Sequence, residues 1–298
     1  MTTDGTLHTP KRRLVRANGV ELCVQTFGDV ANPAILLIGG AAMSMDWWDD
    51  EFCELLTAGR RFVIRYDHRD TGQSVSYEPG APQYTGRDLV ADAVGLLDAL
   101  GLEQAHIVGI SMGGGIAQDL ALEHPVRVAS LTLISTSPAV PRGPDKPALP
   151  PMSERLASVF AEPIPEPDWS DREAVIDYMI EGERCFSGSL GFDEDHMRVL
   201  AGRVVDRTVN MASSMKNHWM LEEGEPVRTH LDEITVPALV LHGTEDPLFP
   251  FGHGEALADE IPGARLLPLD GIGHEIPPPP VWDQVVTAIL DHTGRRGA

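Results

Sequence analysis

The stretch Gly109-Ile110-Ser111-Met112-Gly113 decides the fold of this chain of 298 residues, because it has the pattern G-x-S-x-G. A short apolar run precedes it at 105–110, and apolar residues at helical spacing follow it at 112–121. This context predicts a serine on a tight turn between a buried strand and a helix, the arrangement called a nucleophile elbow. Glycine two residues before and two residues after the serine suits a turn that leaves no room for side chains. The free N–H groups at the start of the helix, including that of Met112, would point toward the reacting centre.

Two polar residues follow predicted strands later in the chain. Asp246 comes after the apolar run that ends at Gly243, and His274 comes after the run that ends at Leu269. The carboxyl ends of parallel strands lie along one edge of a sheet, so we expect these side chains to meet Ser111 there. The order serine, acid, histidine is that of a catalytic triad on an open α/β sheet. In such a triad His274 would take the proton of Ser111, and Asp246 would hold the imidazole in the required tautomer.

Composition disfavours several classes of partner. The chain has 23 Lys and Arg against 45 Asp and Glu, and its net charge of −22 disfavours nucleic acid and anionic membranes. No apolar run approaches the roughly 20 residues of a membrane-spanning helix. The first residues also lack the apolar segment of a secretory signal, so we expect a cytoplasmic protein. Cys23, Cys53 and Cys185 fit neither a metal site nor a disulfide framework and are expected to be buried and reduced.

The middle of the chain has a different pattern from the two ends. Residues 34–38 are five consecutive apolar residues, which indicates a strand buried on both faces of a parallel sheet. Six prolines lie between 138 and 151, where no regular element can form. We predict an α/β core formed by residues 1–137 and 231–298, with residues 138–230 inserted as a helical cap. The helices expected in this cap are 153–160, 171–185 and one long helix from about 194 to 221.

The loop after the strand 34–38 is a candidate for contact with substrate. Gly40 lies in a small-residue stretch that lets the backbone approach a ligand, and Met43 is a candidate for an apolar wall of the binding site. Core packing is the alternative for Met43 and for the neighbouring Met and Trp residues.

Other polar residues receive a structural interpretation. Asp67, His68 and Asp70 are expected to fix a tight loop by charge-assisted hydrogen bonds rather than to take part in chemistry. His196 and His218 lie on predicted helices, and single histidines on helices are common, so neither is assigned a role.

Five segments together resemble the α/β-hydrolase superfamily across nearly the whole chain. The ten residues 65–74, Arg-Tyr-Asp-His-Arg-Asp-Thr-Gly-Gln-Ser, are similar to the aclacinomycin methylesterase branch of that superfamily. The five segments are Ile38-Gly-Gly40, Tyr66 to Ser74, Gly109 to Gly113, His242 to Pro247 and Gly271 to His274.

The resemblance implies a mostly parallel sheet flanked by helices, with an inserted helical cap and no cofactor or metal. It implies that the N–H groups of Ala41 and Met112 form the oxyanion hole. The sequence departs from the family pattern at Gly39-Gly40, because relatives usually have His-Gly before the oxyanion residue. Asp70 stands where many members have glycine, a change that the methylesterase branch shares.

These observations predict a monomeric or homodimeric enzyme that acts on a small-molecule ester. The expected reaction is hydrolysis of a carboxylic ester of a largely apolar molecule, including a methyl ester of a polyketide-type compound, through an acyl-enzyme on Ser111. A cofactor-free haloperoxidase or perhydrolase, a C–C bond hydrolase and a lactonase would use the same triad. A non-catalytic ligand-binding homologue is a further alternative. Haloalkane dehalogenases and epoxide hydrolases need an aspartate at the elbow, so Ser111 excludes both.

Overall fold

Eight strands form one sheet in the computed structural model, which describes residues 12–140, 145–222, 224 and 230–294. The strands lie in the order β1-β2-β4-β3-β5-β6-β7-β8. β1 and β2 are antiparallel to their neighbours, and the strands from β4 to β8 are parallel, so the predicted fold class is confirmed. The bounds are β1 Arg12–Ala17, β2 Val20–Phe27, β3 Ala34–Ile38, β4 Phe62–Tyr66, β5 Ala105–Ile110, β6 Val128–Ile134, β7 Ala238–Gly243 and β8 Arg265–Leu269.

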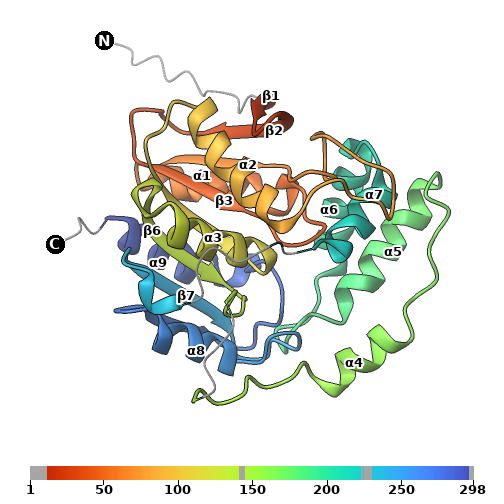
Figure 1. Ribbon diagram of the computed structural model, residues 1–298. Coiled ribbons are helices and arrows are strands. Elements are labelled where there is room, and N and C mark those ends of the chain that lie inside the picture. The colour runs from red at the N-terminus through yellow and green to blue at the C-terminus, as the bar shows by residue number, and fades with distance from the viewer. Residues whose placement is uncertain (1–11, 141–144, 223, 225–229, 295–298) are drawn as a thin grey trace, which may run out of the picture.

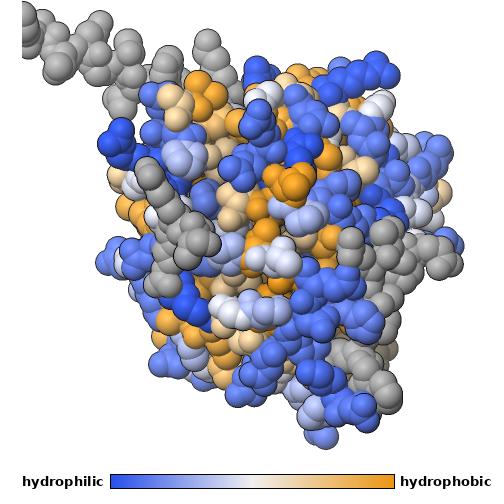
Figure 2. Space-filling model, turned by 60° about the vertical axis from the view of Figure 1, so that its left-hand side comes forward, coloured by the Kyte–Doolittle hydropathy of each residue, from blue (hydrophilic) through white to orange (hydrophobic). Residues whose placement is uncertain are grey.

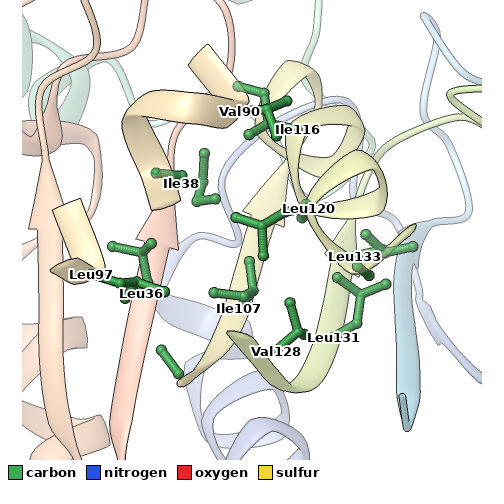
Figure 3. Close-up of a cluster of buried hydrophobic side chains, with 14 of the residues drawn as sticks. Leu36, Ile38, Val90, Leu97, Ile107, Ile116, Leu120, Val128, Leu131 and Leu133 are labelled. Carbon is green, nitrogen blue, oxygen red and sulfur yellow. The ribbon is translucent and has the colours of Figure 1, made fainter. Parts of the chain in front are cut away.

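Helices cover both faces of this sheet (Figure 1). Because successive side chains of a strand point to opposite faces, Leu36 and Ile38 join one buried cluster while Ile35 and Leu37 join another. Figure 3 shows the first cluster, in which strand residues such as Ile107 pack against two helices. That face carries α2 (Gly86–Ala99), α3 (Met112–Glu123) and α8 (Gly252–Glu260), and the other face carries α1 (Asp50–Ala58) and α9 (Trp282–Gly294).

Four further helices lie together at one side of the sheet (Figure 1). Two of them match the helices predicted at 153–160 and 171–185 to within one residue at each end. The prediction of one long helix from 194 to 221 is wrong, because the chain leaves the helix after Arg207. There the N–H of Val209 donates to the Gly72 carbonyl (2.8 Å), and the Asn210 side chain caps the next helix by accepting from the N–H of Ser213 (3.1 Å). The four helices are α4 Glu154–Ala161, α5 Arg172–Arg184, α6 Glu194–Arg207 and α7 Met211–Lys216, and α7 continues into the 3₁₀ turn Asn217–Met220.

A buried ion cluster joins these helices to the loops of the sheet. Arg207, the last residue of α6, donates to the carboxylates of Asp67 (2.6 Å) and Asp46 (2.7 Å). The three side chains are 6%, 0% and 2% exposed, respectively. The cluster therefore anchors the end of α6 beside the strand-end loops near Ser111.

A second junction ties the segment after α5 to the loop that carries His274. The Phe186 carbonyl accepts from the N–H of His274 (2.8 Å), and the N–H of Leu190 donates to the Gly271 carbonyl (3.2 Å). The Ser189 hydroxyl donates to the Glu245 carboxylate (2.7 Å). Residues 186–190 thus contact the loops after both β7 and β8.

Hydrophilic residues cover most of the face shown in Figure 2, with hydrophobic side chains in smaller patches between them. Among the described residues, no helix combines the length and the apolar character needed to cross a membrane.

Candidate active site

Ser111 occupies the turn between β5 and α3 with a strained backbone, φ 52° and ψ −121°. Two hydrogen bonds hold this conformation: the N–H of Ser111 donates to the Ile134 carbonyl (3.0 Å), and the Thr136 hydroxyl donates to the Ser111 carbonyl (2.8 Å). The flanking glycines are required by space, because a Cβ on Gly109 would lie 2.2 Å from the Gly113 carbonyl oxygen. The strand–turn–helix context predicted from G-x-S-x-G is therefore present.

The structure brings the three residues of the predicted triad together. His274 Nε2 lies 3.0 Å from Ser111 Oγ, and His274 Nδ1 lies 2.8 Å from Asp246 Oδ2. Asp246 and His274 are 3% and 7% exposed. Asp246 Oδ1 also accepts from the N–H groups of Leu248 and Phe249, at 2.9 and 2.8 Å, which fixes the carboxylate.

The carboxylate sets the tautomer of the histidine. An ionised Asp246 can only accept, so Nδ1 of His274 carries the proton and Nε2 is left to accept from the Ser111 hydroxyl. This is the arrangement in which a histidine can act as a general base toward a serine. A second aspartate, Asp270, lies four residues before His274 in the chain, but it is exposed and makes no described contact with His274.

The loop Gly39–Ala42 lies against Ser111. A Cβ on Gly40 would be 3.3 Å from Ser111 Cβ, and a Cβ on Gly113 would be 2.4 Å from the carbonyl oxygens of Ile38 and Gly39. Among the described residues, the N–H groups of Ala41 and Met112 have no hydrogen-bond partner. Both predicted oxyanion donors are therefore near the nucleophile and available to a ligand.

Met43 and Gly40, the predicted substrate contacts, touch each other beside Ser111. The N–H of Gly40 donates to the Met43 sulfur (3.3 Å), and Met43 is 8% exposed. The Met43 side chain therefore both packs in the core and lies next to the loop that faces the nucleophile.

Asp67 and Asp70 have the structural role expected of them. Asp67 accepts from Arg207 and from the N–H of Met45 (2.8 Å), and Asp70 accepts from the Tyr84 hydroxyl (2.7 Å). Neither residue makes a described hydrogen bond to the triad. Asp70 also has a positive φ of 66°, which fixes the tight loop after β4.

Two partly buried carboxyl groups were not predicted from sequence: Glu275, the residue after His274, and Glu183, which interacts with Glu275. Glu275 accepts from the N–H of Gly273 (3.2 Å), and burial raises its pKa. Burial, reinforced by Glu275, raises the pKa of Glu183 to about 7. Both side chains line a cavity of about 430 Å³ between α5, α6 and the loop after β8. Only the three-dimensional placement of α5 brings Glu183 here, so no local sequence signal could have revealed it.

The described residues contain no cluster of His, Cys, Asp or Glu suited to hold a metal ion. Cys23 and Cys53 are buried, Cys185 is partly exposed, and all three are free thiols.

Comparison with known proteins gives a family and a number of curated relatives, two of which are methylesterases. Residues 33–278 match the family model described as the alpha/beta hydrolase fold. The rhodomycin D methylesterases of Streptomyces sp. (strain C5) and Streptomyces peucetius are 32% and 31% identical to the chain. Each alignment covers 94% of this chain and 97% of the relative. Among solved structures, a hydrolase from Pseudomonas aeruginosa PA01 superimposes with a TM-score of 0.67 at 25% identity, over 97% of this chain and 99% of that one.

Proposed function

The chain belongs to the α/β-hydrolase fold family, and from this premise we propose that it is a serine hydrolase that cleaves a carboxylic ester of a small, largely apolar molecule. Within that class we propose a methyl ester of a polyketide-type acid as the substrate. The observation that carries the proposal is the hydrogen-bonded series Ser111–His274–Asp246. The two methylesterase relatives, similar over nearly the whole chain, support the choice of ester.

Acylation begins with the attack of Ser111 Oγ on the ester carbonyl. The hydroxyl proton moves to His274 Nε2, 3.0 Å away, as the new C–O bond forms. Asp246 stabilises the imidazolium through the 2.8 Å bond to Nδ1. When the tetrahedral intermediate collapses, the bond to the alkoxy group breaks and His274 returns the proton to the leaving alcohol, which leaves the acyl group on Ser111.

Deacylation repeats these steps with water. His274 Nε2 takes a proton from a water molecule that attacks the acyl carbonyl, and then returns the proton to Ser111 Oγ as the carboxylic acid leaves. In both steps the oxyanion accepts from the N–H groups of Ala41 and Met112. A donor of this kind typically contributes about 3 kcal/mol to stabilising the transition state.

Helices α4–α7 fit the proposed role of residues 138–230 as a cap. The end of α6 and residues 186–190 contact the loops that follow β4, β7 and β8, at the same edge of the sheet as Ser111. A cap in this place would enclose the apolar part of the substrate next to Ser111. A cytoplasmic location and a monomeric or homodimeric state stay predictions, which cell fractionation and light scattering would test.

The decisive experiment compares wild type and Ser111→Ala on a panel of methyl esters of aliphatic, aromatic and polycyclic acids. Methanol and free acid are quantified by mass spectrometry, and rapid acid quenching followed by intact-mass analysis reveals the acyl group on Ser111. Ser158→Ala, on the exposed side of α4, serves as the matched control and should turn over like wild type. Ester turnover that survives in Ser111→Ala would refute the assignment.

A second series sizes the acyl pocket. Rates on p-nitrophenyl esters from acetate to decanoate give the preferred chain length. If wild type hydrolyses no ester above the Ser111→Ala background, the C–C hydrolase and ligand-binding alternatives take precedence.

A further inference from the structure

His218, which sequence analysis left without a role, lies directly behind the loop that faces Ser111. It belongs to the 3₁₀ turn after α7 and is 6% exposed. Its Nδ1 accepts from the N–H of Ala42 (2.9 Å), and its Nε2 lies 2.9 Å from the Arg69 carbonyl oxygen. Because an amide N–H can only donate and a carbonyl can only accept, His218 must be the neutral tautomer with its proton on Nε2. One imidazole thus links the last turn of the inserted helices to two loops of the sheet.

The hydrogen bonds of the loop single out the amide that is left free. The Gly39 carbonyl accepts from His68 Nε2 (3.0 Å), which fixes the first peptide plane. The Gly40 carbonyl accepts from the N–H of Met43 (3.2 Å), and the N–H of Ala42 donates to His218. Between these fixed groups, the N–H of Ala41 is the donor with no described partner.

The hydrogen bond that Ala42 donates to His218 holds a strained part of the loop. Ala42 has φ 60°, the left-handed region that costs a residue with a side chain about 1 kcal/mol. The N–H of Ala42 belongs to the peptide directly after Ala41, so its direction is coupled through the φ and ψ angles of Ala41 to the preceding amide, whose carbonyl also accepts from the N–H of Met43. Removal of the acceptor would leave a strained residue free to relax and to rotate the amide of Ala41 away.

We propose that His218 is a positioning residue that holds the oxyanion loop, so that the inserted helices complete the oxyanion hole. The inference rests on the proposed ester hydrolysis. The loop itself has Gly39-Gly40 and no histidine, so its support comes from His68 in the core and from His218 across 176 residues of sequence. Burial, with a smaller contribution from His68, lowers the pKa of His218 to about 3, so Nδ1 remains an acceptor throughout the working pH range.

Two substitutions separate the two hydrogen bonds of His218. In His218→Asn, the amide oxygen can occupy the position of Nδ1 and accept from Ala42. In His218→Gln, the amide nitrogen can reach the position of Nε2 and donate to the Arg69 carbonyl, but no acceptor remains for Ala42. His218→Asn therefore loses only the hydrogen bond to Arg69, and His218→Gln loses only the one from Ala42. Both replacement side chains are polar and smaller than histidine.

We expect kcat of His218→Gln on the best ester to fall about tenfold. This is less than the 10²- to 10³-fold loss that removal of an oxyanion donor produces, because the Ala41 donor is displaced and not removed. KM should change little, and His218→Asn should recover most of the rate. Affinity for a trifluoromethyl ketone, whose tetrahedral adduct places an oxyanion in the hole, should fall in parallel with kcat/KM. Affinity for the product acid should stay the same.

His124→Gln, at the opposite end of α3, is the control for loss of a histidine, and thermal denaturation checks that all variants are folded. Equal loss of kcat in the Asn and Gln variants would overturn the proposal, as would a change confined to KM or unchanged affinity for the ketone. This failure differs from failure of the proposed function, in which wild type itself would show no Ser111-dependent turnover.

Discussion

Replacing Arg207 with methionine should destabilise the protein by about 3 kcal/mol. Loss of one partner from a buried ion pair typically costs about 3–5 kcal/mol, because the remaining charge stays buried without its counter-ion. Here Asp67 and Asp46 would both lose their main cation. The lower end of the range applies because Asp67 keeps the N–H groups of Met45 and Gln73, at 2.8 and 2.9 Å.

The expected change in Tm follows from the size of the chain. An unfolding entropy of about 2.1 cal/mol/K per residue gives about 0.6 kcal/mol/K here, so a loss of 3 kcal/mol lowers Tm by about 5 °C. Arg172→Met is the matched control, because Arg172 also binds a carboxylate through Nε (2.6 Å to Asp206), but the two side chains are 48% and 58% exposed. Such an exposed ion pair contributes at most about 1 kcal/mol to the free energy of unfolding.

Thermal denaturation of wild type and the two variants gives the Tm values to compare, and urea titration gives the free energy of unfolding as an equilibrium check. Equal losses of Tm in Arg207→Met and Arg172→Met would refute the reasoning, since burial would then make no difference to the ion pair.

Three further predictions concern the site and its surroundings. Asp246→Asn should lower kcat strongly with little change in fold, because the amide favours the wrong histidine tautomer. The same change in the chymotrypsin triad lowers kcat by a factor of about 10⁴. An unchanged kcat would mean that another residue is the acid. Gly113→Ala should lower both kcat/KM and Tm, because the new Cβ would lie 2.4 Å from two backbone oxygens, whereas Gly115→Ala, whose nearest contact is 3.9 Å away, should do neither. Glu183→Gln should stabilise the protein at pH 8 more than at pH 5. The raised pKa of about 7 means that the folded state loses stability as pH rises from about 4.5 to 7, by about 3 kcal/mol at most. Tm measured across this pH range for wild type and variant tests the sign, and a gain that is larger at pH 5 would contradict it.

The residues of the site that could be predicted from sequence are those with a local signal. Ser111 has glycines at fixed offsets, and Asp246 and His274 each come just after an apolar strand. Parallel strands that end at one edge of a sheet bring such positions together whatever lies between them. The fold class was predictable for the same reason, because the strand pattern and the elbow are both short-range features.

Residues of the inserted helices could not be assigned in this way. Arg207 and His218 contact loops of the sheet that are 140 and more residues away in sequence, and neither belongs to a motif. The break between α6 and α7 did have a local signal, since Asn210 is a helix-capping residue placed three before Ser213. Apolar residues at helical spacing on both sides of the break concealed it.

The bonds of residues 186–190 to the loops after β7 and β8 have a consequence for the design of chimeras. A graft that exchanges all of residues 138–230 with those of a relative would replace the segment whose backbone carbonyl accepts from the N–H of His274, and a donor segment with another backbone path would place that carbonyl elsewhere. The new enzyme would then combine a foreign binding surface with an altered geometry of the general base. A transplant of specificity should therefore keep 186–190 with the recipient and join the donor helices on either side of this segment.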